Sequence, residues 1–447
     1  MRHETQRVSA LGRVALAGLF ATVPRLFYDV EVSGLEYDTG APRTYYAMTH
    51  KRDLDGIVPV PPIMFHRGWR GLTADVHFAL RSDAFEPGFL AHMLPHPRWF
   101  SLLLRPISVG PVLRGVGAHP LRSLRERTAA VWLREALQAE GDQPAGELLA
   151  PALLAEISAA TRTKLDTLGQ LPLSRLLSWR FHAALQAYYG PEIFAGRARR
   201  RAERRVLAAA KAYLADVAGW LRRGGSLYNG PEGQLSPDGR LSQITSGMHR
   251  LLRAAPPDTR ILPIALVYDF MYDFMTRGRP RLFVDLAPPI EAASSLPRRA
   301  LDAALRTAWL RAARFTCTQL ASDLLAERHS AARGDFTPED IAEAVHARAQ
   351  ALADAGRHVD WRLLTPQGAQ RQVARYLSYA RRHGIVRRSE HGAWRVHRGV
   401  EPLHVPLGHV GYSMAPLTYA RNEYAEMLSV SAPRATQALR SPSTCFD

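Results

Sequence analysis

Short apolar segments alternate with longer amphipathic segments from about Val30 to Leu286, and this alternation most narrows the choice of fold. It predicts an α/β fold in which helices flank a mixed, mostly buried central sheet. The expected strands are Thr44–Met48, Ala74–Leu80, Gly117–Leu121, Ser226–Tyr228, Ile261–Tyr268 and Arg281–Leu286. The expected helices are Leu124–Gln138, Leu173–Tyr188 and Ala198–Arg222, followed by one long helix, or two, over Arg298–Arg328.

A Gly-Asp step at 334–335 marks the boundary of a different C-terminal part. Two predicted helices, Pro338–Ala355 and Pro366–His383, precede two short strands, Ile385–Arg388 and Trp394–His397. This order is typical of a winged-helix-like module. We therefore expect an N-terminal segment at 1–29, a main domain at 30–330 with a helical insertion at about 140–195, and a C-terminal module at 335–447 that ends in a loose tail.

The N-terminal segment carries a short apolar run, Val14–Val23, bounded by Arg13 and Pro24. About 10 apolar residues cover only half of a bilayer's hydrocarbon core, so the run is too short to cross a membrane. It also lacks the cleavage site of a secretory signal. Its apolar residues recur at helical spacing, which predicts either an amphipathic segment on a membrane surface or a helix packed on the domain.

The formal net charge is +17, with 58 Lys and Arg against 41 Asp and Glu. Such a surface favours a polyanionic partner, which could be nucleic acid, anionic lipid headgroups or a phosphorylated small molecule. The two cysteines, Cys317 and Cys445, are far apart in the sequence, which excludes a disulfide framework and favours a reducing, cytoplasmic compartment.

His50 follows the strand Thr44–Met48, and Asp55 stands five residues later. Side chains at this spacing point apart on a helix but can meet across the turn at the end of a strand. A positioned imidazole can take the proton of an attacking alcohol, and a buried carboxylate on the other ring nitrogen fixes the tautomer. Lys51 and Arg52 beside this base are expected to attract an anionic acceptor.

Two further clusters lie at the ends of later segments. Gly117–Leu121 leads into Arg122, whose guanidinium suits a phosphate. The loop after Ser226–Tyr228 carries Gly230, Pro231, Glu232 and Gly233, an irregular turn that exposes backbone amides and one carboxylate. Ile261–Tyr268 then forms a buried strand that contains a proline near its start.

The order of these four elements resembles the glycerolipid acyltransferase family, the glycerol-3-phosphate and lysophosphatidate acyltransferases, over residues 50 to 268. The resemblance implies that His50 is the catalytic base, Asp55 its partner, Arg122 a phosphate ligand, and Glu232 with Gly233 part of the acceptor site. Arg52 departs from the family, which has a small hydroxylated residue there, and we expect it to bind the substrate in place of a missing arginine. Leu235 stands where the family has an arginine, which leaves the acceptor open. The segments Ser236–Leu241 and Tyr419–Glu423 are similar to stretches of the glycerol-3-phosphate branch.

An enzyme of this family transfers a fatty acyl group from acyl-CoA or acyl carrier protein to a phosphorylated glycerol-type hydroxyl, a step of phospholipid biosynthesis. The resemblance therefore implies an O-acyltransferase that acts on glycerol-3-phosphate or a lysophospholipid. No metal or redox cofactor is expected. The expected location is cytoplasmic and peripheral, on an anionic membrane surface at the inner face.

Three alternatives stay open. A basic nucleic-acid-binding protein would use Arg371, Arg375, Arg381 and Arg382 along one helix, although this leaves the ordered N-terminal motifs unexplained. A metal hydrolase would draw on His66, His77, His92, His96 and His119, although Pro95 and Pro97 interrupt the helix that the His92–His96 spacing needs. A scaffold that has kept the fold and lost activity is the third.

Overall fold

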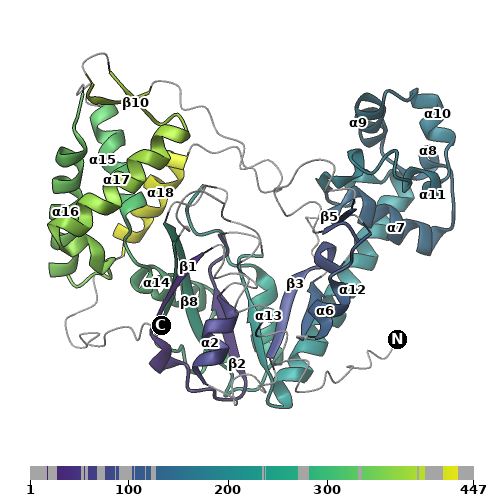
Figure 1. Cartoon of the computed structure of the whole chain (residues 1–447). Helices are drawn as coiled ribbons and strands as arrows, with labels where there is room; N and C mark the ends of the chain where they lie inside the picture. The colour runs from purple at the N-terminus through teal and green to yellow at the C-terminus, as the bar shows by residue number, and fades with distance from the viewer. Residues whose placement is uncertain are drawn as a thin grey trace. The chain divides into compact units, whose positions relative to one another are not determined.

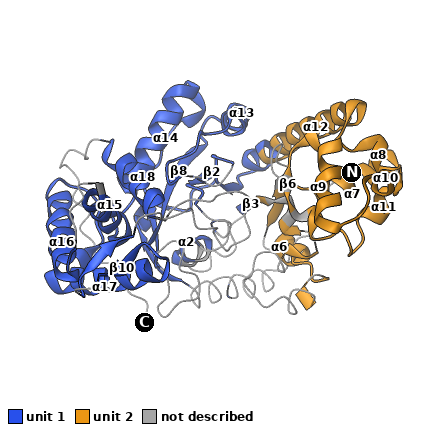
Figure 2. Cartoon of the chain, turned by 90° about the horizontal axis from the view of Figure 1, so that it is seen from above, with its two compact units in different colours: residues 1–78, 218–406, 411–447 blue, residues 79–217, 407–410 orange. Residues whose placement is uncertain are grey.

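The computed structural model describes residues 18, 28–51, 55, 59–67, 76–85, 87–89, 103–104, 106–115, 117–121, 127–233, 236, 238–269, 281–330, 335–389, 392–397 and 416–430. The chain forms two compact units (Figure 2). Unit 1 comprises residues 1–78, 218–406 and 411–447, and unit 2 comprises residues 79–217 and 407–410. The C-terminal helices therefore belong to the same unit as the central strands.

A mixed seven-stranded sheet runs through the fold in the order β1-β9-β8-β2-β7-β3-β4 (Figure 1). Strand β2 pairs in parallel with β7 and β8, β3 is parallel to β7, and β9 is antiparallel to β8 and parallel to β1. The strands are β1 Asp29–Ser33, β2 Thr44–Met48, β3 Val76–Arg81, β4 Ala118–Leu121, β7 Ser226–Asn229, β8 Arg260–Asp269 and β9 Arg281–Leu286. The predicted α/β class with a mixed central sheet is confirmed.

The central strands are buried on both faces. Every residue of β2 and β9 is buried, and in β8 only Arg260 is partly exposed. Strands that are covered on both faces have continuous runs of apolar residues, and such runs can be recognised in the sequence. Helix α14 (Arg298–Ala312) packs on β8, and its Trp309 donates an indole hydrogen bond to the Ala47 carbonyl at 2.9 Å.

The segment predicted as one long helix, or two, forms two helices, α14 and α15 (Cys317–Ser330). They are separated at residues 313–316, where the Phe315 amide donates to the His358 carbonyl at 2.8 Å. The predicted helix Leu173–Tyr188 is wrong. Only α11 (Leu173–Leu176) and a single 3-10 turn, Ala184–Gln186, are helical there. Packing overrides local helical propensity in this segment, because Phe181 and Leu185 turn into the unit 2 core and the strand Tyr188–Tyr189 pairs with Arg127–Thr128.

Unit 2 has its own apolar core, which includes Trp132, Leu133, Ile157 and Leu168. Several short helices follow one another in the region of the predicted insertion, between two longer helices. The helices of unit 2 around this core are α7 Ala129–Glu140, α8 Ala145–Leu148, α9 Pro151–Thr161, α10 Leu165–Gln170, α11, and the unit 2 part of α12 Gly196–Arg222.

The C-terminal part contains the helix–helix–hairpin order expected from the sequence. Helix α16 (Pro338–Asp354) begins with a capping box between Thr337 and Asp340, and α17 (Pro366–Arg382) follows it. Strands β10 (Val386–Arg388) and β11 (Trp394–Val396) pair antiparallel. Helix α18 (Pro416–Leu428) then packs against α15.

None of the helices that the structure describes has the length and apolar character needed to cross a bilayer. The N-terminal run Val14–Val23 lies outside the described residues apart from Gly18.

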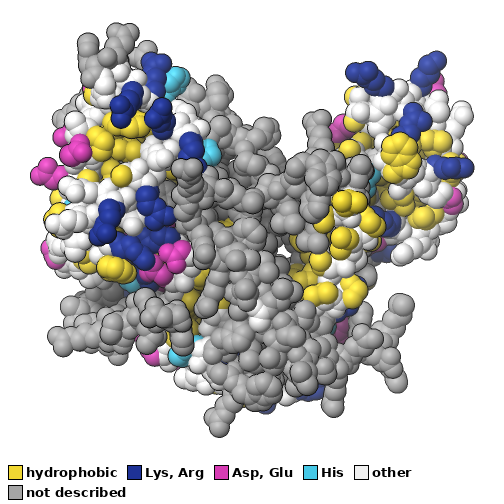
Figure 3. Space-filling view, in the orientation of Figure 1, with side chains coloured by type: hydrophobic (Ala, Val, Ile, Leu, Met, Phe, Trp, Pro, Cys, Tyr) yellow, Lys and Arg dark blue, Asp and Glu magenta, His cyan; other side chains and the backbone are white. Residues whose placement is uncertain are grey.

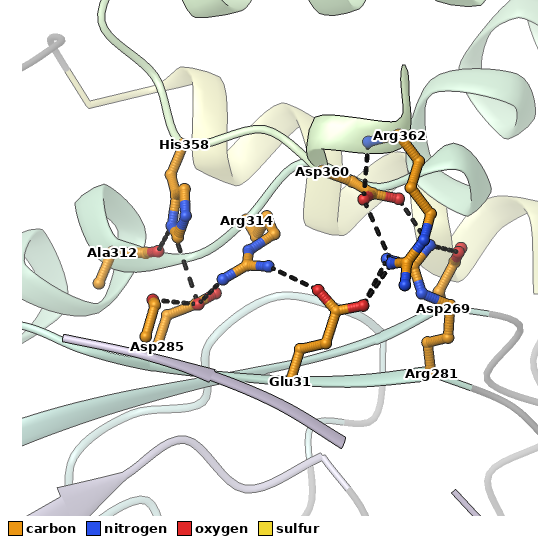
Figure 4. Close-up of polar contacts among 10 residues, drawn as sticks. Glu31, Asp269, Arg281, Asp285, Ala312, Arg314, His358, Asp360 and Arg362 are labelled. Atoms are coloured by element: carbon orange, nitrogen blue, oxygen red, sulfur yellow. Dashed lines mark hydrogen bonds and ion pairs between the residues drawn. The ribbon is translucent and has the colours of Figure 1, made fainter. Parts of the chain in front are cut away.

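A buried ionic network joins the C-terminal part to the sheet within unit 1 (Figure 4). The Arg281 side chain is 1% exposed and contacts Asp360 at 2.6 Å, Glu31 at 3.2 Å and Asp269 at 3.5 Å. Arg314 bridges Glu31 at 3.2 Å and Asp285 at 2.7 Å. Strands β1, β8 and β9 are thereby fastened to the segment that precedes α17.

Replacing Arg281 by Met should lower the free energy of unfolding by about 3 to 5 kcal/mol, because the buried carboxylates of Asp269 and Asp360 lose their main cation. Urea unfolding followed by circular dichroism measures this. Arg298→Met is the matched control. Its ion pair with Asp302 lies partly in reach of solvent, since the two side chains are 43% and 25% exposed, so the cost should stay below about 1 kcal/mol. Equal effects of the two changes would contradict the importance of the network.

Candidate active site

The parallel pairing of β2 with β7 and β8 brings two loops together at the carboxyl ends of these strands. Ligands of α/β proteins commonly bind at this edge. Thr49, which follows β2, is fixed to β8: its amide bonds to the Ile264 carbonyl at 3.0 Å, and its hydroxyl accepts from the Leu266 amide at 2.9 Å. The next residue is His50, and its carbonyl accepts from the Ser236 amide at 2.9 Å.

His50 and Asp55 meet as their spacing predicted. The imidazole Nδ1 lies 3.3 Å from Asp55 Oδ2, and the Asp55 side chain is fully buried. Asp55 also accepts from the Lys51 amide and from the Tyr268 hydroxyl. Asp55 therefore contacts the imidazole at Nδ1 and two further donors, and Nε2 lies on the opposite side of the ring.

The His50 side chain is 18% exposed, so it lies partly in reach of solvent. Gly230, the first residue after β7, lies directly against it. A Cβ atom at position 230 would come 3.3 Å from the His50 Cβ. A glycine here lets the β7 loop approach the imidazole closely.

Glu232 anchors the backbone on both sides of the site. Its Oε2 accepts from the His50 amide at 2.7 Å, and its Oε1 accepts from the Ser242 amide at 2.6 Å. The residue is 2% exposed. Burial raises the pKa of Glu232 to about 7, although Lys51 and the His50 amide oppose this rise. Both oxygens are held by backbone amides, and binding of acceptor hydroxyls by Glu232 stays a prediction.

Gly233 shapes the same loop. Its φ of +69° lies in the left-handed region, and a Cβ atom would come 2.9 Å from the Thr245 methyl group. Its amide closes a turn onto the Gly230 carbonyl at 3.1 Å. The glycine is therefore needed for the turn that brings Glu232 to His50.

Lys51 has a different role from the one expected. Its side chain is 5% exposed, its ammonium pairs with Glu423 at 3.2 Å, and it donates to the Gly239 carbonyl at 3.2 Å. Burial alone would lower the pKa of the ammonium, but Glu423 and other nearby acidic groups reverse this and hold the pKa above its usual value. The expectation that Lys51 attracts an anionic acceptor is therefore wrong, because its charge is already paired inside the protein.

Two of the predicted substrate ligands, Arg52 and Arg122, lie outside the described residues, as does Leu235. Their roles stay predictions.

The histidines of the metal hypothesis do not converge within the part of the chain that the structure describes. No group of three or more His, Cys, Asp or Glu side chains there is placed to hold a metal ion. His77 is buried, with its ring centroid 5.9 Å from that of Trp220, and His66 is exposed at the end of α2 (Val60–His66). His92 and His96 lie outside the described residues.

Compared with known proteins, the chain matches no family model and no curated protein.

Two residues of this site were missed as site residues in the sequence, although each left a partial signal. Tyr268 ends an apolar strand, where a hydroxyl is an exception. Glu423 closes a stretch similar to one in the glycerol-3-phosphate branch. Their partners could not be predicted, because each contact joins segments far apart in the sequence.

Replacing Glu232 by Gln removes the ionisable carboxyl at nearly constant volume. The folded chain holds the Glu232 proton more tightly than the unfolded chain, because burial raises the pKa from 4.5 to about 7. As the pH rises through this window, the free energy of unfolding of the wild type should fall relative to that of E232Q, by about 1 kcal/mol or more. Urea unfolding at a series of pH values measures the difference. A difference that does not change with pH would contradict the raised pKa.

Proposed function

We propose that this chain is an O-acyltransferase that moves a fatty acyl group from a thioester donor to the hydroxyl of a glycerol-phosphate-type acceptor. The observation that carries the proposal is the 3.3 Å contact between His50 Nδ1 and the buried Asp55 carboxylate, with the imidazole partly exposed at the carboxyl end of a parallel strand. An oriented imidazole at such an edge is suited to general-base chemistry.

The proposed reaction uses the two ring nitrogens differently. Nε2 takes the proton of the acceptor hydroxyl as its oxygen attacks the thioester carbonyl, and Asp55 stabilises the imidazolium that forms. The tetrahedral intermediate then collapses, the carbon–sulfur bond breaks, and the leaving thiolate receives the proton from His50. The products are an ester and a free thiol, so atoms and charges balance without an oxidant or reductant.

The spatial order of the motifs supports the same proposal. The resemblance to glycerolipid acyltransferases rests on elements that follow one another from His50 to Tyr268. Three of them lie at neighbouring strands: His50 after β2, Glu232 after β7, and Tyr268 on β8 in contact with Asp55. Glu232 bonds directly to the His50 amide. Segments that resemble the family in sequence are therefore joined in space around the same imidazole.

The net positive charge of the chain supports the proposed acyl donor and the proposed location at a membrane. Acyl-CoA and acyl carrier protein are both acidic, as are the headgroups of an anionic membrane, and the chain carries a net charge of +17. We propose glycerol-3-phosphate or a lysophospholipid as acceptor, with the enzyme working at the cytoplasmic, inner face of the membrane in phospholipid biosynthesis. No metal ion takes part in the proposed steps, so transfer should persist after chelation with EDTA.

Purified protein should transfer a radiolabelled acyl group from acyl-CoA or acyl carrier protein to one member of a panel of glycerol-phosphate and lysophospholipid acceptors. His50→Ala and Asp55→Asn should each lower kcat by about a hundredfold or more, because the base or its orienting carboxylate is lost. His66→Ala, an exposed histidine on α2, is the matched control and should keep full activity. A His50→Ala variant with near wild-type kcat would rule out the mechanism.

One observation favours the alternative of nucleic-acid binding. Arg371, Arg375, Arg381 and Arg382 are all exposed on α17, which has no acidic residue. Basic side chains gather over the C-terminal helices on the face shown in Figure 3. Such a surface would suit phosphates by charge alone.

On the acyltransferase proposal, the chain should bind anionic liposomes and show no specific affinity for DNA. Fluorescence anisotropy with a mixed-sequence duplex at 50 and 200 mM salt tests this. Binding to DNA that is tight and falls by about a thousandfold between these salt concentrations would favour the nucleic-acid alternative.

A further inference from the structure

Helix α18 lies on the loop that follows Glu232. Asn422 donates to the Asp238 carbonyl at 2.9 Å, and the Glu426 carboxylate accepts from the Leu241 amide. Gly239 has a φ of +83°, and a Cβ atom there would come 2.2 Å from the Tyr419 carbonyl oxygen. The backbones of helix and loop are therefore in direct contact, and no other residue type fits at position 239 without moving one of them.

Glu423, on the same helix, contacts the residue next to the proposed base. Its Oε1 lies 3.2 Å from the Lys51 ammonium, and its Oε2 accepts from the Gln319 amide group at 2.7 Å. The side chains of Lys51 and Glu423 are only 5% and 10% exposed. The carboxylate is thus fixed from α15 on one side and holds the ammonium on the other.

Lys51 links this ion pair to the proposed catalytic pair. Its backbone amide donates to the Asp55 carboxylate, and its ammonium donates to the Gly239 carbonyl at 3.2 Å. A shift of Lys51 therefore moves its backbone amide, which is a donor to Asp55. It also moves His50, which precedes Lys51 in the chain. A buried ammonium without its carboxylate would be drawn toward water, and this shift would follow.

We propose that Glu423 of α18 is a positioning residue, which holds Lys51 in place and thereby keeps the His50 imidazole in contact with the Asp55 carboxylate. The inference rests on the proposed acyl transfer. Glu423 does not touch the reacting atoms, and it acts through one neighbour. Helix α18 is, on this view, part of the active site as well as part of the C-terminal packing.

The test is Glu423→Gln, which removes the charge at nearly constant volume. At a temperature well below unfolding, kcat for acyl transfer should fall by about tenfold to a hundredfold, since small misplacements of catalytic groups have effects of this size. The KM values should change by no more than about twofold. Arg421→Gln is the control: it removes an exposed contact of α18 with Asp323, at 3.4 Å, and should leave kcat unchanged.

A second readout does not depend on acyl transfer. Diethyl pyrocarbonate modifies accessible imidazoles, and mass spectrometry of the peptide that contains His50 gives the rate of its modification. This rate should rise several-fold in E423Q and stay at the wild-type value in R421Q. If the wild type transfers no acyl group, the proposed function is wrong, and the rate of modification still decides the role of Glu423.

Wild-type kcat and a wild-type rate of His50 modification in E423Q would overturn the proposal, even if the melting temperature were lower. Should E423Q fail to fold, the double variant K51M/E423L replaces the buried pair by apolar side chains, a change that proteins often tolerate. A low kcat in this folded variant supports the proposal, and a wild-type kcat overturns it.

Discussion

The hydrogen bonding of β2 between β7 and β8 is the constraint on which the site depends. Because the three strands run in parallel, the residues that follow β2 and β7 emerge at the same edge of the sheet. The side chain of Glu232 then bonds to the His50 amide, and the Tyr268 hydroxyl reaches Asp55 from β8. Each of these contacts joins segments separated by long stretches of chain, so β2, β7 and β8 must be paired before the site exists.

Burial of charge is the second theme of the structure. The sequence has a large excess of arginine, yet some of its cations are used inside the protein. Arg281 is almost fully buried among three carboxylates, and Lys51 is buried against Glu423. Both ion pairs join the sheet or its loops to the C-terminal helices. Buried ion pairs add little stability compared with apolar packing, but they are intolerant of a missing partner.

The fold was predictable where one physical signal dominates. The central strands are continuous apolar runs, and the ends of β2, β8 and β9 lie within about one residue of the prediction. Strand β1 was missed because Asp29 and Glu31 interrupt its pattern at the sheet edge. The helix expected at Leu173–Tyr188 failed because tertiary packing of Phe181 and Leu185 outweighs local propensity. The His50–Asp55 contact follows from spacing at a strand end, whereas the Lys51–Glu423 pair leaves no local signal.

The pairing of Lys51 with Glu423 has a consequence for biosynthesis. The ribosome makes the chain from its N-terminus at about 5 to 20 residues per second, so β2 and Lys51 emerge long before α18. Until Glu423 is made, the ammonium has no partner on α18 and is better accommodated in water than in the interior. The Lys51–Glu423 ion pair can therefore form only after α18, the last described helix, has been made. A polypeptide released before residue 423 would lack this ion pair.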